Sequence, residues 1–269
     1  MSMREKNFAL QELRRVREAL PHRLRARRRR VWPPIGMVRF GSLRRLHPID
    51  RFFGWSRGTP IDRYYIERFL ERQAGDEGYI LGDIRGRVLE IGDDRYTRQF
   101  GRVWEGPPEE APPGAVTAVE ILQADGSNPE ATVVGDLVTG EGVPDAAFDC
   151  VICTEVMQLI YDVKAAVANI SRSLKPGGVA LVTLPGLSPR CRPDADIFGD
   201  YWRFTSQSVR RIFEESFPPE NVTVETAGNV HVAAAFLYGL CAEDLRREAL
   251  ELHDPDYELN IQVRAVKPS

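Results

Sequence analysis

Acidic residues follow short apolar runs at regular points in the middle of this 269-residue chain. Glu90 and Gly92 end the apolar run at residues 88–92, Glu120 ends a second run, and Asp136 follows a third. A glycine lets the backbone approach a ligand closely, and an acid after the second strand of a nucleotide-binding unit accepts hydrogen bonds from ribose hydroxyls. The pattern therefore predicts a site for an adenosine-bearing cofactor.

The elements that must position these acids alternate along residues 85–269. Strands are expected near residues 87–91, 116–120, 131–135, 148–153, 178–184, 222–226 and 259–266, and helices near 61–73, 95–100, 162–174, 206–216 and 231–250. Such alternation is typical of a mostly parallel sheet with helices on both faces. The last strand alternates apolar and polar residues, as an antiparallel or partly exposed strand does. We predict an α/β fold with a doubly wound, mostly parallel seven-stranded sheet, whose carboxyl edge gathers the acids.

The composition is that of an ordinary soluble globular protein, with 43% hydrophobic and 28% charged residues. No apolar run is long enough to cross a bilayer, and the charged start argues against a secretory signal. Cys150 and Cys153 form a C-x-x-C inside a predicted strand, where positions three apart point to opposite faces, so we interpret them as buried thiols. These features predict a cytoplasmic protein.

The net charge of −3 hides an asymmetry. Residues 1–57 hold 16 of the 36 Lys+Arg and 4 of the 39 Asp+Glu, which leaves 20 basic and 35 acidic residues elsewhere. We divide the chain into a basic N-terminal arm (1–57), a helical cap (58–84) and a cofactor-binding domain (85–269). The arm, helical near residues 5–30, either folds over the cofactor or meets an anionic partner, namely nucleic acid or a membrane surface.

Several short motifs in order resemble those of the class I S-adenosylmethionine-dependent methyltransferases. They are Val-Leu-Glu-Ile-Gly at 88–92, Gly-Asp-Leu at 135–137, the run 148–156, and Leu-Lys-Pro-Gly-Gly at 174–178. Stretches at 58–65 and 200–205 are similar to those of a bacterial subgroup. The resemblance implies a Rossmann-like fold and S-adenosylmethionine as cofactor.

The glycine-rich loop departs from the family pattern, because only Gly92 of Gly-x-Gly-x-Gly remains and Asp93 and Asp94 follow it. Carboxylates at this turn disfavour a phosphate-bearing ligand but tolerate a positively charged sulfonium.

Carried onto this chain, the family's cofactor contacts fall on seven residues. Glu90 and Gly92 would lie against the methionine part, Glu120 at the ribose, Asp136 and Leu137 at the adenine, and Thr154 and Glu155 beneath the sulfonium.

The acceptor side is expected in the long connection at residues 187–205, because loops of this length in compact domains are usually functional. Its aromatic and charged side chains suit a sugar or another polar ring, or else simply pack the loop onto the body. Trp202 and Arg203 in this loop, and Arg63, Tyr64 and Tyr65 in the cap, are the expected acceptor contacts.

Catalytic candidates are Asp200, Tyr201 and His231. His231 opens a predicted helix near the carboxyl edge of the sheet, and imidazole is the side chain best suited to a base at neutral pH. No cluster has metal-ligand spacing, so no catalytic metal is predicted.

The main functional hypothesis is O-methylation of a small molecule or a glycan. An RNA methyltransferase that uses the basic arm is one alternative, and a non-catalytic scaffold that keeps the fold is another. The sequence is also compatible with assembly of the protein into a homo-oligomer.

Overall fold

The computed structural model describes residues 41–76, 80–124 and 129–269. The chain divides into two units, Met1–Leu46 and His47–Ser269. Of the first unit only residues 41–46 are described, with the 3-10 helix Gly41–Leu43 (η1), so the helix predicted at residues 5–30 lies outside the described residues. Residues 47–57, which the sequence grouped with the arm, belong to the larger unit.

The larger unit alternates strands and helices, as expected. Its strands are β1 (Gly75–Asp76), β2 (Ile80–Leu81), β3 (Gly86–Ile91), β4 (Val116–Gln123), β5 (Val133–Val134), β6 (Phe148–Thr154), β7 (Leu174–Pro185), β8 (Val222–Ala227) and β9 (Asn260–Val266). Its α-helices are α3 (Ile61–Gln73), α4 (Arg95–Phe100), α5 (Val163–Ser173), α6 (Arg192–Ile197), α7 (Ser206–Phe213), α8 (Val230–Leu237) and α9 (Arg247–Glu251). The 3-10 helices are η2 (Pro108–Glu110), η3 (Met157–Leu159), η4 (Pro219–Asn221) and η5 (Ala242–Asp244).

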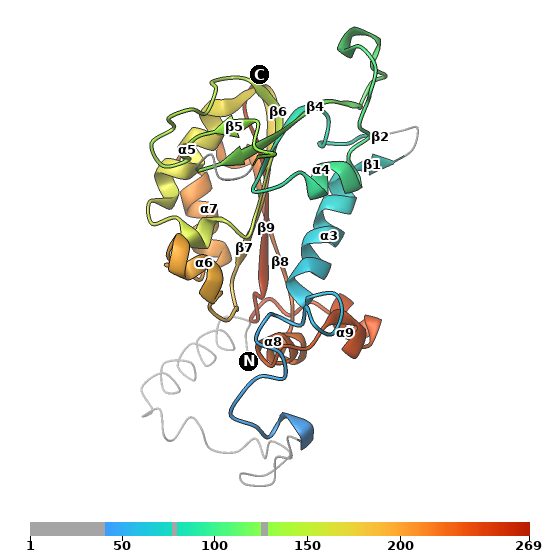
Figure 1. Ribbon diagram of the computed structural model, residues 1–269, viewed down its shortest axis with the longest axis vertical. Coiled ribbons are helices and arrows are strands. Elements are labelled where there is room, and N and C mark those ends of the chain that lie inside the picture. Colours follow the sequence, from blue (N-terminus) through green and yellow to red (C-terminus); the bar gives the residue numbers. More distant parts are fainter. Residues whose placement is uncertain (1–40, 77–79, 125–128) are drawn as a thin grey trace, which may run out of the picture. The chain divides into compact units, whose positions relative to one another are not determined.

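The main sheet has seven strands in the order β5-β4-β3-β6-β7-β9-β8. Strands β3 to β7 pair in parallel, whereas β9 is antiparallel to both β7 and β8. The chain moves outward from β3 in one direction to β5 and then returns to β6 and continues in the other direction (Figure 1). The order therefore reverses between β3 and β6, and ligands of doubly wound sheets bind beyond the carboxyl ends at such a point. The predicted fold class is confirmed.

Helices cover both faces of the sheet (Figure 1). On one face α3 and α4 bury side chains such as Phe69 and Leu70 against β3, β6 and β7. On the other face α5 and α7 form a second core around Ile170 and Phe213. Cys150 belongs to the first core and Cys153 to the second, because successive strand positions alternate between faces.

Several element boundaries differ from the prediction. The cap helix matches residues 61–73, but β4 runs three residues beyond Glu120 and β5 keeps only two of the five residues expected. The helix predicted at residues 231–250 breaks into α8, η5 and α9. Gly239, with a φ of +71°, follows α8 and turns the chain through the left-handed region, which glycine adopts without strain.

Candidate active site

A cavity of about 290 Å³ lies at the carboxyl ends of β3, β4 and β5. The segment that follows β6 forms another part of its wall. Its walls are mostly apolar, with an amide and a carboxylate among them. They comprise Ile91, Gly92, Leu122, Gln123, Ala124, Gly135, Asp136, Leu137, Val156, Leu159, Ile160 and Phe198. The cavity lies where the strand order reverses, so its position and lining suit an uncharged ring system held by a few polar contacts.

Gly92 forms the turn that opens this cavity. Its φ is +99°, and a Cβ atom added there would meet nothing within 4 Å, so the backbone faces open space. Gln123, the last residue of β4, donates from Nε2 to the Gly92 carbonyl oxygen over 2.8 Å. The turn is therefore braced by the neighbouring strand and leaves room for a ligand against the backbone.

The two carboxylates after Gly92 are bound to α4 and are not among the residues that line the cavity. Asp93 accepts a hydrogen bond from the Arg95 backbone N–H, and Asp94 forms an ion pair with Arg98. Their charge still lies at the turn, where it disfavours a phosphate, but their side chains do not fill the cavity.

Glu90 lies in the interior, with only 2% of its surface exposed. Its two carboxylate oxygens accept hydrogen bonds from the Tyr96 N–H (3.0 Å), the Thr97 N–H (2.7 Å) and the Thr97 hydroxyl (2.7 Å). Burial raises the pKa of Glu90 to about 7, although these hydrogen bonds oppose the shift. The side chain therefore ties the start of α4 to the end of β3.

A second acidic group, Glu155, lies directly after β6. Its φ of +53° is in the left-handed region, which is unfavourable for a residue with a side chain and costs about 1–3 kcal/mol. The backbone is held there because Glu155 N–H donates to the Thr183 carbonyl (3.0 Å) and Gln158 Nε2 donates to the Glu155 carbonyl (2.7 Å). Such enforced strain is common at functional sites.

The environment of the Glu155 carboxyl favours its neutral form. Burial raises the pKa to about 8, the nearby Asp62 carboxyl raises it further, and the Arg63 guanidinium opposes both effects. Burial likewise raises the pKa of Asp62, in the first turn of α3. A carboxyl group with a pKa near neutrality can accept a proton from a bound reactant at physiological pH.

Arg63 joins this acidic centre to the rest of the cap. Its Nη1 donates to the Tyr96 hydroxyl over 2.6 Å, and the guanidinium lies 5.7 Å from the centre of the Trp55 ring and 5.6 Å from that of Tyr96. The guanidinium is therefore held in place by two aromatic rings and remains close enough to influence Glu155.

Two buried amides of β9 connect Glu155 to the outer side of the sheet. Asn260 is 1% exposed and donates from Nδ2 to Glu155 Oε1 over 3.1 Å, and its Oδ1 accepts from Gln262 Nε2 over 3.1 Å. Arg72 in turn donates to Gln262 Oε1 over 3.0 Å. Because Arg72 can only donate, it fixes the direction of both amides and presents an N–H to Glu155.

The sequence matches the model of a known family, which is described as a methyltransferase domain. The match covers residues 114–182, from the end of the loop before β4 into β7. This match agrees with the strand order of the sheet and with the position of the cavity, which lies where that order reverses. Residues 114–182 are therefore part of a methyltransferase domain on a Rossmann-like sheet. A comparison with curated protein sequences finds no match.

Solved structures similar to this methyltransferase share little sequence with it. Phosphoethanolamine N-methyltransferase 2 of Haemonchus contortus is 17% identical, with a TM-score of 0.44 over 77% of this chain and 53% of that one. The N-methyltransferase NodS of Bradyrhizobium japonicum is 13% identical (TM-score 0.45; 85% and 97% covered), and a methyltransferase of Archaeoglobus fulgidus is 15% identical (TM-score 0.46; 81% and 100%). The chain thus spans about half the length of the Haemonchus enzyme.

Among the predicted cofactor residues, the methyltransferase brings Gly92, Asp136 and Leu137 together around the cavity. Thr154 ends β6, where it pairs with Thr183 of β7, and Glu155 follows it. Glu90 is placed differently from the prediction: its carboxylate is buried against α4 and positions the turn at Gly92 rather than facing the cavity.

The prediction that Glu120 ends its strand is wrong. β4 continues to Gln123, and Glu120 lies within the strand, where it forms an ion pair with Arg87 across to β3 at 3.0 Å. The residue that reaches the cavity from the end of β4 is Gln123, which sequence reasoning missed because it expected an acid. The signal available was the continued apolar run Ile121-Leu122 after Glu120.

The loop residues predicted for catalysis mainly hold the loop in shape. Asp200 and Arg203 form a two-bond ion pair (2.6 and 3.0 Å), and the Asp200 side chain is 3% exposed. Arg203 also donates to backbone carbonyls of residues 188 and 189, and Trp202 Nε1 donates to the Ile160 carbonyl. Tyr201 is half exposed and meets Tyr161 edge to face.

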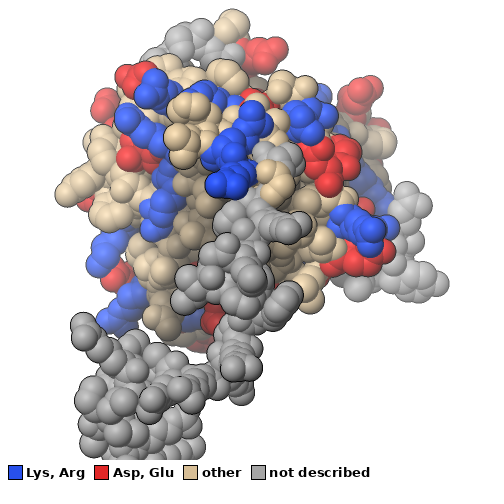
Figure 2. All heavy atoms as spheres, turned by 90° about the horizontal axis from the view of Figure 1, so that it is seen from below, with Lys and Arg blue, Asp and Glu red and all other residues tan. Residues whose placement is uncertain are grey.

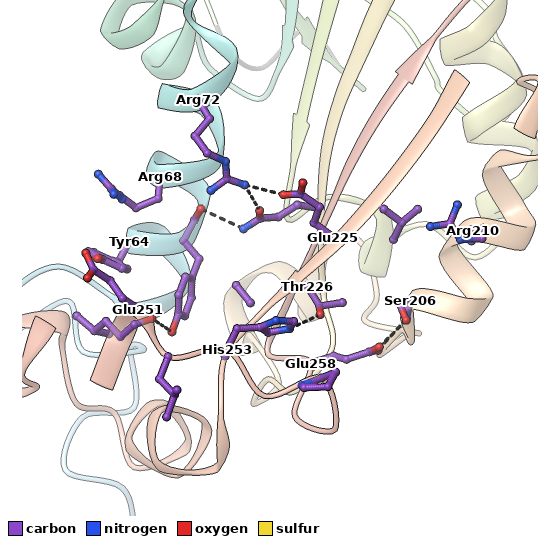
Figure 3. A pocket seen from close by; sticks show the side chains of 18 of the residues that line it. Tyr64, Arg68, Arg72, Ser206, Arg210, Glu225, Thr226, Glu251, His253 and Glu258 are labelled. Carbon is purple, nitrogen blue, oxygen red and sulfur yellow. Dashed lines mark hydrogen bonds and ion pairs between the residues drawn. The ribbon is translucent and has the colours of Figure 1, made fainter. Parts of the chain in front are cut away.

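Tyr64 and Tyr65 do not line the cavity, whereas Arg63 does reach the acidic centre. The Tyr65 hydroxyl donates to the Leu250 carbonyl, and both tyrosines line a separate groove of about 640 Å³ beside β8 (Figure 3). Their predicted contact with the acceptor stays a prediction, and both side chains lie on the groove beside β8.

His231 lies in the first turn of α8 and is exposed, and its backbone N–H is capped by Asn229. Its ring is not among the residues that line the cavity. Within the described residues no group of three or more His, Cys, Asp or Glu side chains could hold a metal ion. Sequence reasoning placed Asp62 in the cap but missed Asn260, because Asn260 approaches Glu155 from a strand far away in the chain.

Proposed function

We propose that this methyltransferase transfers a methyl group from S-adenosylmethionine to an oxygen atom of a small molecule or a glycan. The proposal depends on one juxtaposition: Val156, which lines the largely apolar cavity, directly follows Glu155, whose carboxyl belongs to the acidic centre. S-Adenosylmethionine supplies an electrophilic methyl group, so the protein's main tasks are alignment and deprotonation of the acceptor.

The cavity residues fit the nucleoside part of this cofactor. Leu137 and Ile91 provide an apolar surface for the adenine, and Asp136 at the rim offers an acceptor for its exocyclic amine. Gln123 offers an amide near the ribose. The carboxylates of Asp93 and Asp94 at the turn favour a cofactor without phosphates.

The acidic centre supports a hydroxyl as the methyl acceptor, because a hydroxyl becomes a good nucleophile only when it gives up its proton. Glu155, with a pKa raised to about 8, is suited to receive that proton. Arg63 nearby stabilises the negative charge that develops. We assign the base to Glu155 in place of His231, which is exposed and away from the cavity lining.

We further propose that the reaction takes place in the cytoplasm. The four cysteines are free thiols, and within the described residues no helix is long and apolar enough to cross a bilayer.

Calorimetry with S-adenosylhomocysteine tests the cofactor assignment, with ATP and NAD as phosphate-bearing controls. We expect heat of binding for S-adenosylhomocysteine and none for the controls. Absence of binding at millimolar S-adenosylhomocysteine would support the scaffold alternative and overturn the proposal.

Mass spectrometry after incubation with S-adenosylmethionine tests the acceptor class. A panel of sugars and phenols should yield an O-methylated product, whereas a matched panel of amines should not. Methylation of amines alone would overturn the choice of oxygen while leaving the cofactor assignment intact.

A further inference from the structure

Exposed apolar side chains gather on the loops at the carboxyl edge of the sheet. The larger unit exposes large apolar residues at few positions, and ten of them lie on the segments that follow β6, β7 and β8 or precede α3. They are Phe52 (60% exposed), Trp55, Tyr161, Leu187, Ile197 (73%), Phe198, Tyr201, Trp202, Val230 and Leu237 (48%). Scattered exposed apolar residues are normal, but a concentration on one edge marks an interaction surface.

Basic side chains accompany this apolar edge. A hollow of about 360 Å³ is lined on one side by Phe52 and Leu237 and on the other by Arg51, Arg190 and Arg192. This density of arginine contrasts with residues 58–269 as a whole, where acidic residues outnumber basic ones by 35 to 20. The hollow therefore has three arginines against two aspartates, whereas the body as a whole is acidic.

The acidic residues of this edge, which also include Asp162 and Asp194, are engaged within the protein to different degrees. Asp50 accepts hydrogen bonds from Phe52 N–H and from Ser56, and Asp200 is paired with Arg203. Asp196 pairs with Arg190 only at 3.9 Å. Figure 2, a view from the end at which Figure 1 places α6 and α8, shows Lys and Arg side chains beside uncharged surface, with Asp and Glu side chains among them.

We propose that this edge docks the methyltransferase on an anionic lipid surface, with the carboxyl ends of the strands facing the membrane. Apolar side chains entering the boundary between headgroups and acyl chains, together with arginines near anionic headgroups, provide the two signals that stable peripheral binding requires. The site would then open toward acceptors that reside at the lipid surface.

A lipid surface fits this edge better than RNA does. Single-stranded nucleic acid stacks its bases on aromatic rings and gains nothing from aliphatic side chains. Ile197, Leu237, Leu187 and Val230 are aliphatic and exposed, and their transfer from water into hydrocarbon is favourable. The aliphatic members of the edge therefore distinguish the two partners.

Vesicle sedimentation of the full chain without cofactor tests the proposal independently of methyl transfer. Wild-type protein should partition onto vesicles of phosphatidylglycerol and phosphatidylcholine in equal parts far more than onto phosphatidylcholine alone. Ile197→Ser combined with Leu237→Ser should weaken this partitioning roughly tenfold, because two partly inserted side chains are lost. Arg190→Gln with Arg192→Gln should weaken it roughly thirtyfold, since two basic residues near the anionic surface are lost.

Matched controls separate this edge from the rest of the chain. Val103→Ser removes an exposed aliphatic side chain beside the start of β4 and should leave partitioning unchanged. An equal loss in this variant, or wild-type partitioning of the Ile197 and Leu237 pair, would overturn the proposal, the latter because the basic arm alone would then explain binding. Preferential binding of a single-stranded RNA, unaffected by the aliphatic pair, would overturn it in favour of nucleic acid.

Discussion

The cavity and the acidic centre of the candidate site are built in different ways, and they are linked along the chain by Glu155 and Val156. The cavity is lined by residues at or just after the ends of consecutive strands, such as Gly92 after β3, Gln123 at the end of β4 and Asp136 after β5. The acidic centre joins Asp62 of α3, Glu155 after β6 and Asn260 of β9, which are nearly 200 residues apart at the extremes. Local motifs thus form the cavity, whereas long-range packing forms the acidic centre.

The groove beside β8 offers an instructive contrast, although it is larger than the cavity at about 640 Å³. Its charged side chains are satisfied from within the protein, as the pair Arg72 and Glu225 and the hydrogen bond between Thr226 and His253 show (Figure 3). In the cavity, by contrast, most of the wall is apolar. Size alone therefore does not identify the site, and the chemistry of the lining does.

The largest effect is expected for Glu155→Gln, which changes the acidic centre and leaves the cavity intact. The substitution removes the proton acceptor, so we expect kcat for O-methylation to fall roughly 10²- to 10³-fold. The affinity for S-adenosylhomocysteine, measured by calorimetry, should stay the same because the cavity is unchanged. Glu215→Gln, an exposed residue paired with Lys164, serves as control and should leave both quantities unchanged. A parallel loss of cofactor affinity in the Glu155 variant would contradict the division.

The pH dependence of kcat sharpens the role of the neighbours of Glu155. The base must be ionised, so the rate should rise as the pH increases toward the folded-state pKa of about 8 and then level off. Asp62→Asn removes a like charge and should move the rise to lower pH, whereas Arg63→Gln removes an opposing charge and should move it to higher pH. Shifts in the same direction would show that Glu155 does not control the profile.

The cofactor half is tested by comparing two residues of the same strand. Gln123→Ala removes an amide from the cavity wall and the brace on Gly92, so the affinity for S-adenosylhomocysteine should fall by up to roughly tenfold. Glu120→Gln changes a residue that pairs with Arg87 within the strand and should have no effect on affinity. The reverse order, measured by calorimetry, would restore the ribose role predicted for Glu120.

The smallest expected effect is on stability. Glu155 has a folded-state pKa raised above its unfolded value, so its ionisation opposes folding and its destabilising effect grows as the pH rises from about 4.5 to about 8. Glu155→Gln should therefore raise Tm by roughly 2–4 °C at pH 8. At pH 4, where the carboxyl is protonated in both states, Tm should match that of the wild type. An equal gain at both pH values would point to packing instead of ionisation.

Much of the fold could be predicted from the sequence because its signals are local. The helix at residues 61–73 begins after Pro60 and repeats apolar residues at helical spacing, and the alternating pattern of β9 is typical of the antiparallel strand that it forms between β7 and β8. The ends of strands were less certain. β4 continues past Glu120 because Ile121 and Leu122 are buried when they extend the strand, a gain that depends on neighbours absent from the local sequence.

The sequence by itself determined the alternation of elements, and with it the parallel sheet, the turn at Gly92 and the edge at which a nucleoside would bind. Only the tertiary structure decided which carboxyl groups serve that edge. It buried Glu90 against the start of α4, paired Glu120 with Arg87 and Asp200 with Arg203, and left Glu155 among groups that raise its pKa. The physical reason is that a carboxyl group's role depends on desolvation and on charges within a few ångströms, and those neighbours come from distant parts of the chain.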